Sequence, residues 1–459
     1  MIRVIAALML CVAGLTAAPP QDVNTRIDAY IQVEMKRLNI PGLSLAVVKD
    51  ERPFLVKGYG LANIEHGVPV KPETVFQSGS LGKQFTGAAV MLLVEDGQIV
   101  LDEKVSKYLG PVPSAWAGIT VRHLLTHTSG AGGYPKGFDF RRDYTEDELL
   151  KRILEEPLLF QPGEKFAYSN LGYVTLGILI GKVTGKFYGD FLGKRIFTPL
   201  GMTTARIISE ADIVPNRAAG YRLVQGELKN QDWVSPTLNT TADGSLYLTA
   251  LDMIKWDAAL NSPGLFKVSS LDEMWMPVTL KSGGTHPYGF GWMLSRRNDR
   301  KIIEHGGAWQ GFMSHIARYV DDDLTVIVFV NRGGVPAGVI ANGVAAILDP
   351  DLAPRSVPDA APAVTSAHRR LLEDLIAGTT IDKSQFTPQV ATDVLPRIEQ
   401  SRVQVKALGA IDSLEVVERV TKGGTTVHRY RVRFRLATAS YVVAVDAAGK
   451  IAGLSLNPE

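Results

Sequence analysis

Apolar and polar residues alternate along this chain with periods that predict helices in some stretches and strands in others. Residues 24–38 carry apolar side chains at helical spacing, and Pro41 and Gly42 follow where that helix must end. Two apolar-rich runs, 43–49 and 54–61, are separated by a polar turn and predict a β-hairpin. Further helices are predicted over 80–95, 146–155, 170–184 and 251–261.

The pattern changes to short strands between residues 290 and 330. Polar clusters at 296–299 and 321–323 interrupt the apolar residues, as turns between antiparallel strands require. The predicted strands cover 290–295, 300–305, 312–320 and 324–330. Strands at both ends with helices between them predict an α/β fold, in which the sheet edges come from distant parts of the chain and a helical subdomain is inserted.

Four prolines fall close together after residue 349 and predict a semi-extended linker over 351–364. One helix at about 366–377 is predicted beyond this linker. It is followed by four predicted strands, at 413–420, 427–436, 439–446 and 450–456. Residues 365–459 are therefore expected to form a small, separate α+β domain.

The first eighteen residues, 1–18, have the pattern of a secretory signal peptide. Arg3 precedes an apolar run over 4–16, and small residues at 16–18 offer a cleavage site. The apolar run is shorter than the ~20 residues that span a bilayer. The one cysteine, Cys11, lies in this segment, so the mature chain can have no disulfide, thiolate zinc site or cysteine nucleophile. We expect a secreted or periplasmic protein with no membrane span.

The net charge and composition of the chain exclude some classes of function. The 459 residues include 49 basic and 47 acidic side chains, a formal net charge of +2, which does not suit a nucleic-acid binder. Hydrophobic residues make up 46% and charged residues 21%, as in ordinary globular proteins. No glycine-rich nucleotide-binding motif occurs, so no cofactor is expected.

Ser80 and Lys83 are the first candidates for chemistry. They stand three residues apart at the start of a predicted helix, so the hydroxyl and the amine share one helical face. The helix N-terminus and burial both disfavour a protonated lysine, and a neutral Lys83 could take the Ser80 proton. The Ser80 amide could help to hold an oxyanion. An N-cap serine followed by a surface lysine would give the same spacing, but the apolar neighbours Leu81 and Phe85 favour the reactive interpretation.

A second candidate motif is Tyr168-Ser169-Asn170, just before the predicted helix 170–184. The Tyr168 phenol could exchange protons with a serine or a leaving group, and Asn170 offers a donor and an acceptor to a substrate amide or to the lysine. Alternatively, Tyr168 only packs, and Ser169 or Asn170 caps the following helix.

A third candidate motif, His305-Gly306-Gly307-Ala308, ends a predicted strand. Two glycines allow a ligand to approach the strand backbone closely, and the Ala308 amide could be a second oxyanion donor. A glycine-rich bulge or turn between strands would have the same sequence.

In this order the three motifs resemble the serine β-lactamase and penicillin-binding-protein superfamily. The nearer resemblance is to its class C β-lactamase-like branch, which includes D-alanyl-D-alanine carboxypeptidases, D-aminopeptidases and esterases. The likeness covers about residues 24–350 and is supported at 76–83, 124–130, 161–164 and 288–292. It implies an antiparallel sheet flanked by helices, an all-helical lobe, and a site between the two.

The resemblance also implies roles for the candidate residues. Ser80 would be the acylated nucleophile, Lys83 its general base and Tyr168 a proton relay. Substrate would be bound by Asn170, His305, Gly306, Gly307 and Ala308. The expected reaction is hydrolysis of a small amide, short peptide or ester through an ester on Ser80, without a metal or cofactor.

Two departures from that family's pattern bear on the substrate. His305 stands where true class C lactamases commonly have lysine, which weakens the positive charge that would hold a β-lactam carboxylate. Many relatives have a Gly-Gly pair before a helix near position 243, where this chain has Ala242-Asp243-Gly244-Ser245-Leu246. We therefore expect a D-amino-acid peptidase, carboxypeptidase or esterase, with a β-lactamase proper or a slowly acylated penicillin-binding sensor as the alternatives.

Two features have less specific interpretations. His123 and His127 are four residues apart, but no obvious third zinc ligand follows and a structural role is expected. The C-terminal domain resembles small cystatin- or NTF2-like modules, for which capping the cleft and aiding oligomerisation are both open. The oligomeric state is not predicted.

Overall fold

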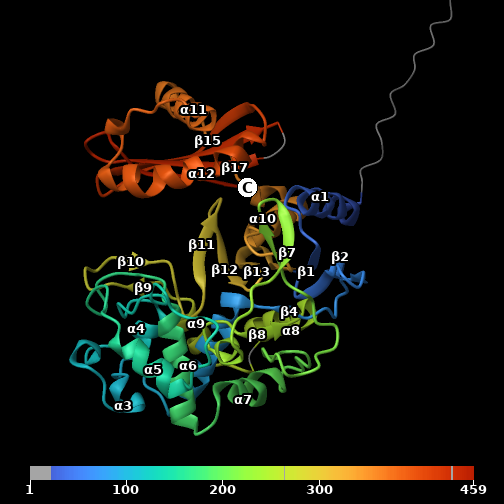
Figure 1. Cartoon of the computed structure of the whole chain (residues 1–459), viewed down its shortest axis with the longest axis vertical. Helices are drawn as coiled ribbons and strands as arrows, with labels where there is room; N and C mark the ends of the chain where they lie inside the picture. Colours follow the sequence, from blue (N-terminus) through green and yellow to red (C-terminus); the bar gives the residue numbers. More distant parts are fainter. Residues whose placement is uncertain (1–21, 263, 436–437, 459) are drawn as a thin grey trace, which may run out of the picture.

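The structure is a computed structural model that describes residues 22–262, 264–435 and 438–458. The predicted signal peptide, 1–18, lies outside the described residues. Within them, no helix is both long enough and apolar enough to cross a bilayer. The main body is a sheet covered by helices, and the C-terminal unit, orange and red in Figure 1, lies at one end of the molecule.

A seven-stranded antiparallel sheet organises the main body, in the order β11-β12-β13-β14-β1-β2-β3. Strand β1 pairs with β14 in the middle of this sheet, from Leu43 opposite Val330 to Lys49 opposite Leu324. The two ends of the body are thereby joined, and the α/β fold class predicted from the sequence is confirmed. The strands are β1 (Gly42–Lys49), β2 (Arg52–Asn63), β3 (Val68–Pro69), β11 (Met293–Arg297), β12 (Arg300–Trp309), β13 (Phe312–Tyr319) and β14 (Leu324–Val330).

Both faces of the sheet are buried. Every residue of β14 is buried, and because successive strand side chains point to opposite faces, Val326 and Val328 join one core cluster while Ile327 and Phe329 join another. The first face is covered by α1 (Val23–Arg37) and α10 (Ala337–Leu348), and the second by α8 (Ala250–Asn261) and the helical lobe.

The helical lobe is built around α2 and α6, which contact each other. Its helices are α2 (Lys83–Glu95), α3 (Ser106–Leu109), α4 (Val121–Leu125), α5 (Glu146–Glu155), α6 (Asn170–Thr184), α7 (Tyr188–Leu192) and α9 (Val268–Met274). Short strands complete the body: β4 (Phe76–Gln77), β5 (Arg206–Ile207), β6 (Tyr221–Val224), β7 (Glu227–Asn230), β8 (Leu246–Leu248), β9 (Val278–Thr279) and β10 (Thr285–His286).

Two predicted elements begin later than expected. The first turn of the helix predicted at 80–95 is a 3-10 turn, η1 (Gly79–Gly82), and the α-helix begins at Lys83. The strand predicted at 290–295 starts at Met293, because Gly291 has a φ of 79° and interrupts extended backbone.

The C-terminal unit is a four-stranded antiparallel sheet with two helices. The strands pair in sequence order, and α11 contacts α12. The elements are α11 (Pro362–Ala377), α12 (Leu395–Lys406), β15 (Ile411–Lys422), β16 (Thr425–Phe434), β17 (Thr438–Val445) and β18 (Ile451–Pro458). The sequence predicted the first helix, which begins at Pro362 rather than near 366, and missed α12.

The proline-rich segment between the two parts is held by hydrogen bonds. The Asn298 side chain, in the β11–β12 turn, donates to the carbonyl oxygens of Asp351 and Ala353, each at 2.7 Å. Farther along, the Val357 amide donates to Val416 O in β15 at 2.7 Å. The segment therefore contacts the main body at one end and the C-terminal sheet at the other.

Candidate active site

Ser80 lies in the η1 turn, which is clamped between two glycine backbones. A β-carbon on Gly307 of β12 would lie 1.9 Å from Ser78 O, and one on Gly244 would lie 2.2 Å from Gly79 O. Gly244 also has a φ of 146°, which L side chains rarely adopt. The turn that carries Ser80 is therefore fixed by direct backbone packing that requires glycine on both sides.

Lys83, the first residue of α2, is completely buried beside Ser80. Its Nζ lies 3.1 Å from Ser80 Oγ and donates to Asn170 Oδ1 at 2.8 Å and to the Asp243 backbone oxygen at 2.5 Å. Burial lowers the pKa of Lys83 to about 8, against the opposing attraction of the Asp243 carboxylate. In the neutral amine, two N–H bonds serve Asn170 and Asp243, so the lone pair is left for the Ser80 proton.

Tyr168 borders the same pair. Its ring centre lies 4.9 Å from Lys83 Nζ. Tyr168 keeps 42% of its surface exposed, yet desolvation of the phenol raises its pKa above the usual value, while the contact with Ser80 opposes that rise. The phenol is therefore protonated at neutral pH and can donate a proton, whereas Lys83 is the group suited to accept one.

The N-terminus of α6 presents Asn170. Ser169 caps this helix by accepting the Gly172 amide at 2.9 Å, which fixes Asn170 as the first helical residue. Because Asn170 Oδ1 accepts from Lys83, the NH₂ group of the same side chain is the part that can donate to a substrate carbonyl.

Strand β12 brings the third motif alongside the turn. Gly306, Gly307 and Ala308 pair with His315, Ser314 and Met313 of β13. A β-carbon on Gly79 would lie 2.4 Å from the Ala308 backbone nitrogen, so that amide is adjacent to the residue before Ser80. The predicted oxyanion donors, the amides of Ser80 and Ala308, are thus brought to one place.

His305 is buried under this wall, and protein groups engage both of its ring nitrogens. Its Nδ1 lies 2.6 Å from Gly306 O, and its Nε2 lies 3.0 Å from the Tyr288 hydroxyl. Burial, helped by the nearby Lys83 cation, lowers the pKa of His305 to about 3. The imidazole is therefore neutral and supplies no fixed positive charge to the site.

A hydrogen-bonded chain links the second and third motifs beneath the site. The Ser169 amide donates to His127 Nδ1 at 3.0 Å, so the His127 proton lies on Nε2, 3.1 Å from the Tyr288 hydroxyl. That hydroxyl then donates to His305 Nε2, and His305 Nδ1 donates to Gly306 O. Burial holds the pKa of His127 far below its usual value, so every link is neutral.

Sequence reasoning missed His127 and Tyr288 as parts of the site. Apart from its place in the supporting segment 124–130, His127 was paired with His123, whose Nδ1 instead accepts the Thr120 amide at 3.2 Å. In the described part of the chain, no three potential metal ligands cluster. The available signal was the Tyr288 segment, which lies seventeen positions before His305 and had been noted only as support for the family resemblance.

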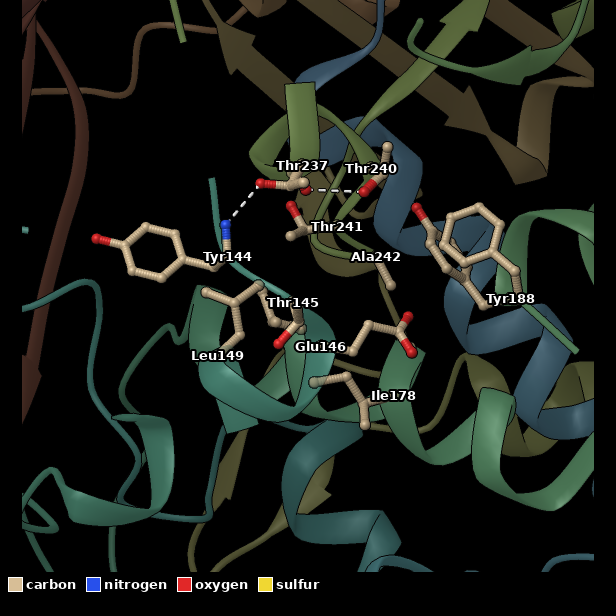
Figure 2. Close-up of a pocket in the computed structure, with 13 residues that line it drawn as sticks. Tyr144, Thr145, Glu146, Leu149, Ile178, Tyr188, Thr237, Thr240, Thr241 and Ala242 are labelled. Atoms are coloured by element: carbon tan, nitrogen blue, oxygen red, sulfur yellow. Dashed lines mark hydrogen bonds between the residues drawn. The ribbon is translucent and has the colours of Figure 1, made fainter. Parts of the chain in front are cut away.

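A separate cavity of about 230 Å³ lies beside the loop that carries Asp243 (Figure 2). Thr237 Oγ1 accepts the Tyr144 amide at 2.9 Å, and Thr240 Oγ1 donates to Thr237 O at 2.7 Å, which shapes one wall. Ala242, next to the residue that anchors Lys83, completes the lining. The cavity is adjacent to the catalytic candidates, but Ser80, Lys83 and Tyr168 do not line it.

The chain is similar in sequence to two curated proteins of related kinds. The chain is 31% identical over 292 residues to penicillin-binding protein 4* of Bacillus subtilis (strain 168), covering 60% of this chain and 64% of that protein. It is 28% identical over 318 residues to the D-aminopeptidase of Gluconobacter oxydans (strain 621H), covering 67% and 59%. The chain thus spans about three-fifths of the length of these relatives.

Solved structures extend the similarity. An octameric penicillin-binding protein homologue from Pyrococcus abyssi matches with a TM-score of 0.64 and 23% identity, over 95% of this chain and 98% of that one, a likeness of fold. The D-amino acid amidase of Ochrobactrum anthropi SV3 matches with a TM-score of 0.62 and 26% identity, over 72% and 98%. The Beta-lactamase family model matches residues 27–348, which hold all three motifs, and the chain belongs to that family.

Proposed function

We propose that this protein is a serine hydrolase that cleaves small amides or esters through an acyl-enzyme on Ser80. The observation that carries the proposal is the 3.1 Å contact between Ser80 Oγ and the buried Lys83 amine, whose pKa is lowered to about 8. An amine of this pKa has a substantial neutral fraction near pH 7 to 8 and can act as a general base.

In the acylation step, Lys83 takes the Ser80 proton as Oγ bonds to the substrate carbonyl carbon. The amides of Ser80 and Ala308 stabilise the oxyanion, and Asn170 orients the substrate. As the intermediate collapses, the bond to the leaving group breaks and that group takes a proton from Tyr168. The Lys83 ammonium, 4.9 Å from the Tyr168 ring centre, then returns a proton to the phenolate.

Deacylation follows the same route with water as the nucleophile. Lys83 removes a proton from the water as the water oxygen attacks the ester carbon, and the Lys83 ammonium gives that proton to the Ser80 oxygen as the ester bond breaks. The products are the free acid and the original enzyme, so the cycle balances without a metal or redox cofactor.

We further propose a D-amino-acid amide, short D-peptide or related ester as the substrate class. Two relatives support this choice, because one is named a D-aminopeptidase and another a D-amino acid amidase. The neutral His305 argues against strong binding of a β-lactam carboxylate. A slowly acylated penicillin-binding protein is the second candidate, favoured by the similarity to penicillin-binding protein 4*.

The remaining parts of the proposal concern the organisation of the chain. Residues 24–350 would form the catalytic domain, 351–364 the linker and 365–459 an accessory domain. Export to the periplasm or medium is proposed from the signal-like pattern of 1–18 alone.

The test compares substrates on the mature protein. D-phenylalanine amide, a D-alanyl-D-alanine peptide, an activated ester and a fluorescent β-lactam are incubated with wild type, Ser80→Ala and the control Ser114→Ala, which changes an exposed serine away from the site. Turnover and intact mass are followed. Turnover that survives in Ser80→Ala rejects the nucleophile, and a β-lactam adduct that does not decay favours the penicillin-binding alternative.

A further inference from the structure

The C-terminal unit contains a cavity of about 430 Å³ between its helices and its sheet. This volume lies within the roughly 300–1,000 Å³ typical of small-molecule sites. The wall is contributed by α11, the turn before α12, α12 itself, β17 and β18. Its apolar members are Leu372, Leu375, Ile376, Val394, Ile398, Val405, Leu454 and Leu456.

Tyr441 of β17 gives this apolar wall an unsatisfied polar group. The side chain is 1% exposed and lines the cavity, and its hydroxyl has no hydrogen-bond partner among the described residues. Its cross-strand neighbour Tyr430 differs, because that hydroxyl lies 2.8 Å from His368 Nδ1. Buried hydroxyls without a partner are rare in folded proteins, so a ligand that supplies one would be favoured.

Among the described residues that line the cavity, Arg402 of α12 is the one that carries a formal charge. Its guanidinium is held against the C-terminal end of α11, where a β-carbon on Gly378 would lie 2.2 Å from an Arg402 nitrogen. Its ion-pair partner, Glu399, is 3.7 Å away and largely exposed, which makes a weak pair. A guanidinium has five N–H donors, so Arg402 can still bind a carboxylate.

We propose that this cavity binds an amphipathic monocarboxylate, such as a medium-chain fatty acid. The acyl chain would lie against the leucine, isoleucine and valine side chains, and the carboxylate would pair with Arg402. The Tyr441 hydroxyl would hydrogen bond to an oxygen of the ligand. The proposal is independent of the Ser80 chemistry, because every residue that carries it belongs to the C-terminal unit.

The test uses the full mature chain with Ser80→Ala, so that acylation of the active site cannot contribute. Binding of cis-parinaric acid is followed by fluorescence, and decanoate, decanol and decyltrimethylammonium are compared as displacing agents. We expect saturable binding, with decanoate displacing the probe at least tenfold more effectively than the cationic analogue.

Two substitutions locate the site. Arg402→Gln is expected to weaken decanoate at least tenfold and leave decanol unchanged, whereas Lys406→Gln, an exposed cation on the same helix, changes neither. Tyr441→Phe removes a hydroxyl that is unsatisfied in the free protein, so the melting temperature without ligand is retained or raised, while the stabilisation given by decanoate becomes smaller.

The proposal would be overturned if the Ser80→Ala protein showed no saturable binding of the probe. It would also be overturned if Arg402→Gln and Lys406→Gln lost decanoate affinity equally. Displacement of the probe by the cationic analogue as strong as by decanoate would likewise contradict it. Light scattering provides a further criterion. If a second copy of the chain occupied the cavity, probe binding would fall as light scattering showed the protein self-associating. That result would also contradict the proposal.

Discussion

Gly307 lies so close to Ser78 that a β-carbon on the glycine would come within 1.9 Å of the Ser78 carbonyl oxygen. The Ser78 carbonyl also accepts a hydrogen bond from Ser314 Oγ at 2.5 Å, so it cannot move without breaking that bond. Position 307 thus couples strand β12 directly to the turn that carries Ser80. The sequence predicts that Gly307 makes room for a ligand, and in the structure it also makes room for the protein's own backbone.

Gly307→Ala is therefore expected to displace the nucleophile turn and to lower kcat/KM by about 10²-fold, the scale of an ångström-sized misplacement. Overpacking should also cost about 1–3 kcal/mol of stability. The control is Gly118→Ala, whose β-carbon would have no other atom within 4 Å. Steady-state kinetics and thermal unfolding of both variants provide the check, and equal behaviour of the two would contradict the coupling.

The pH dependence of kcat/KM should follow the protonation state of Lys83. Because the base must be neutral, and burial lowers its pKa to about 8, kcat/KM should rise tenfold per pH unit below that value and level off above it. The pKa of Tyr168 is raised, so its phenol stays protonated and should cause no loss up to about pH 10. A profile already flat at pH 5, or one that falls between pH 7 and 9, would exclude Lys83 as the base.

Asn170→Asp adds a negative charge beside Lys83 without changing the shape of the side chain, and so tests the role of Lys83 as the base. A carboxylate at the position of Oδ1, 2.8 Å from Lys83 Nζ, favours the ammonium form and raises the Lys83 pKa. The midpoint of the pH–rate profile should move to higher pH by at least about one unit, which lowers activity at pH 7 about tenfold or more. Asn216→Asp, an exposed site, is the control. An unshifted midpoint with reduced activity would mean that Asn170 acts on the substrate alone.

Local patterns in the sequence predicted much of the fold. The helix at 146–155 begins where Thr145 and Glu148 form a capping box, and the helix at 170–184 begins at the Ser169 cap. Such signals lie within a few residues of the element they start. Helix α12 was missed because its apolar pattern is weak, and Val403 within it is 76% exposed.

The candidate site was predicted in part. The three motifs were found because each has reactive side chains at a short fixed spacing, and the structure brings their members together. Asp243 could not be identified in this way, because it anchors Lys83 through a backbone oxygen that every residue type possesses. The chain through His127 and Tyr288 joins residues up to 178 positions apart (305 − 127 = 178), and only the fold reveals such contacts.

Tyr288→Phe tests that chain at its centre. The substitution keeps the ring but leaves His305 Nε2 without its donor and His127 Nε2–H without its acceptor, and both groups are buried. Unsatisfied buried groups of this kind cost about 1–3 kcal/mol each, so we expect lower thermal stability.

The hydrogen-bonded chain through Tyr288 connects the Ser169 amide to the Gly306 carbonyl. Removing the Tyr288 hydroxyl should therefore also lower the reaction rate. We expect kcat to fall about tenfold or more while KM changes little, since Tyr288 acts from beneath the site by positioning Tyr168 and β12. Tyr144→Phe removes the hydroxyl of another buried tyrosine, in the helical lobe, where it donates to Asp139 O at 3.3 Å, and should leave kcat unchanged. If Tyr288→Phe loses stability but keeps full kcat, the chain is structural only, and His127 returns to the role first assigned to it.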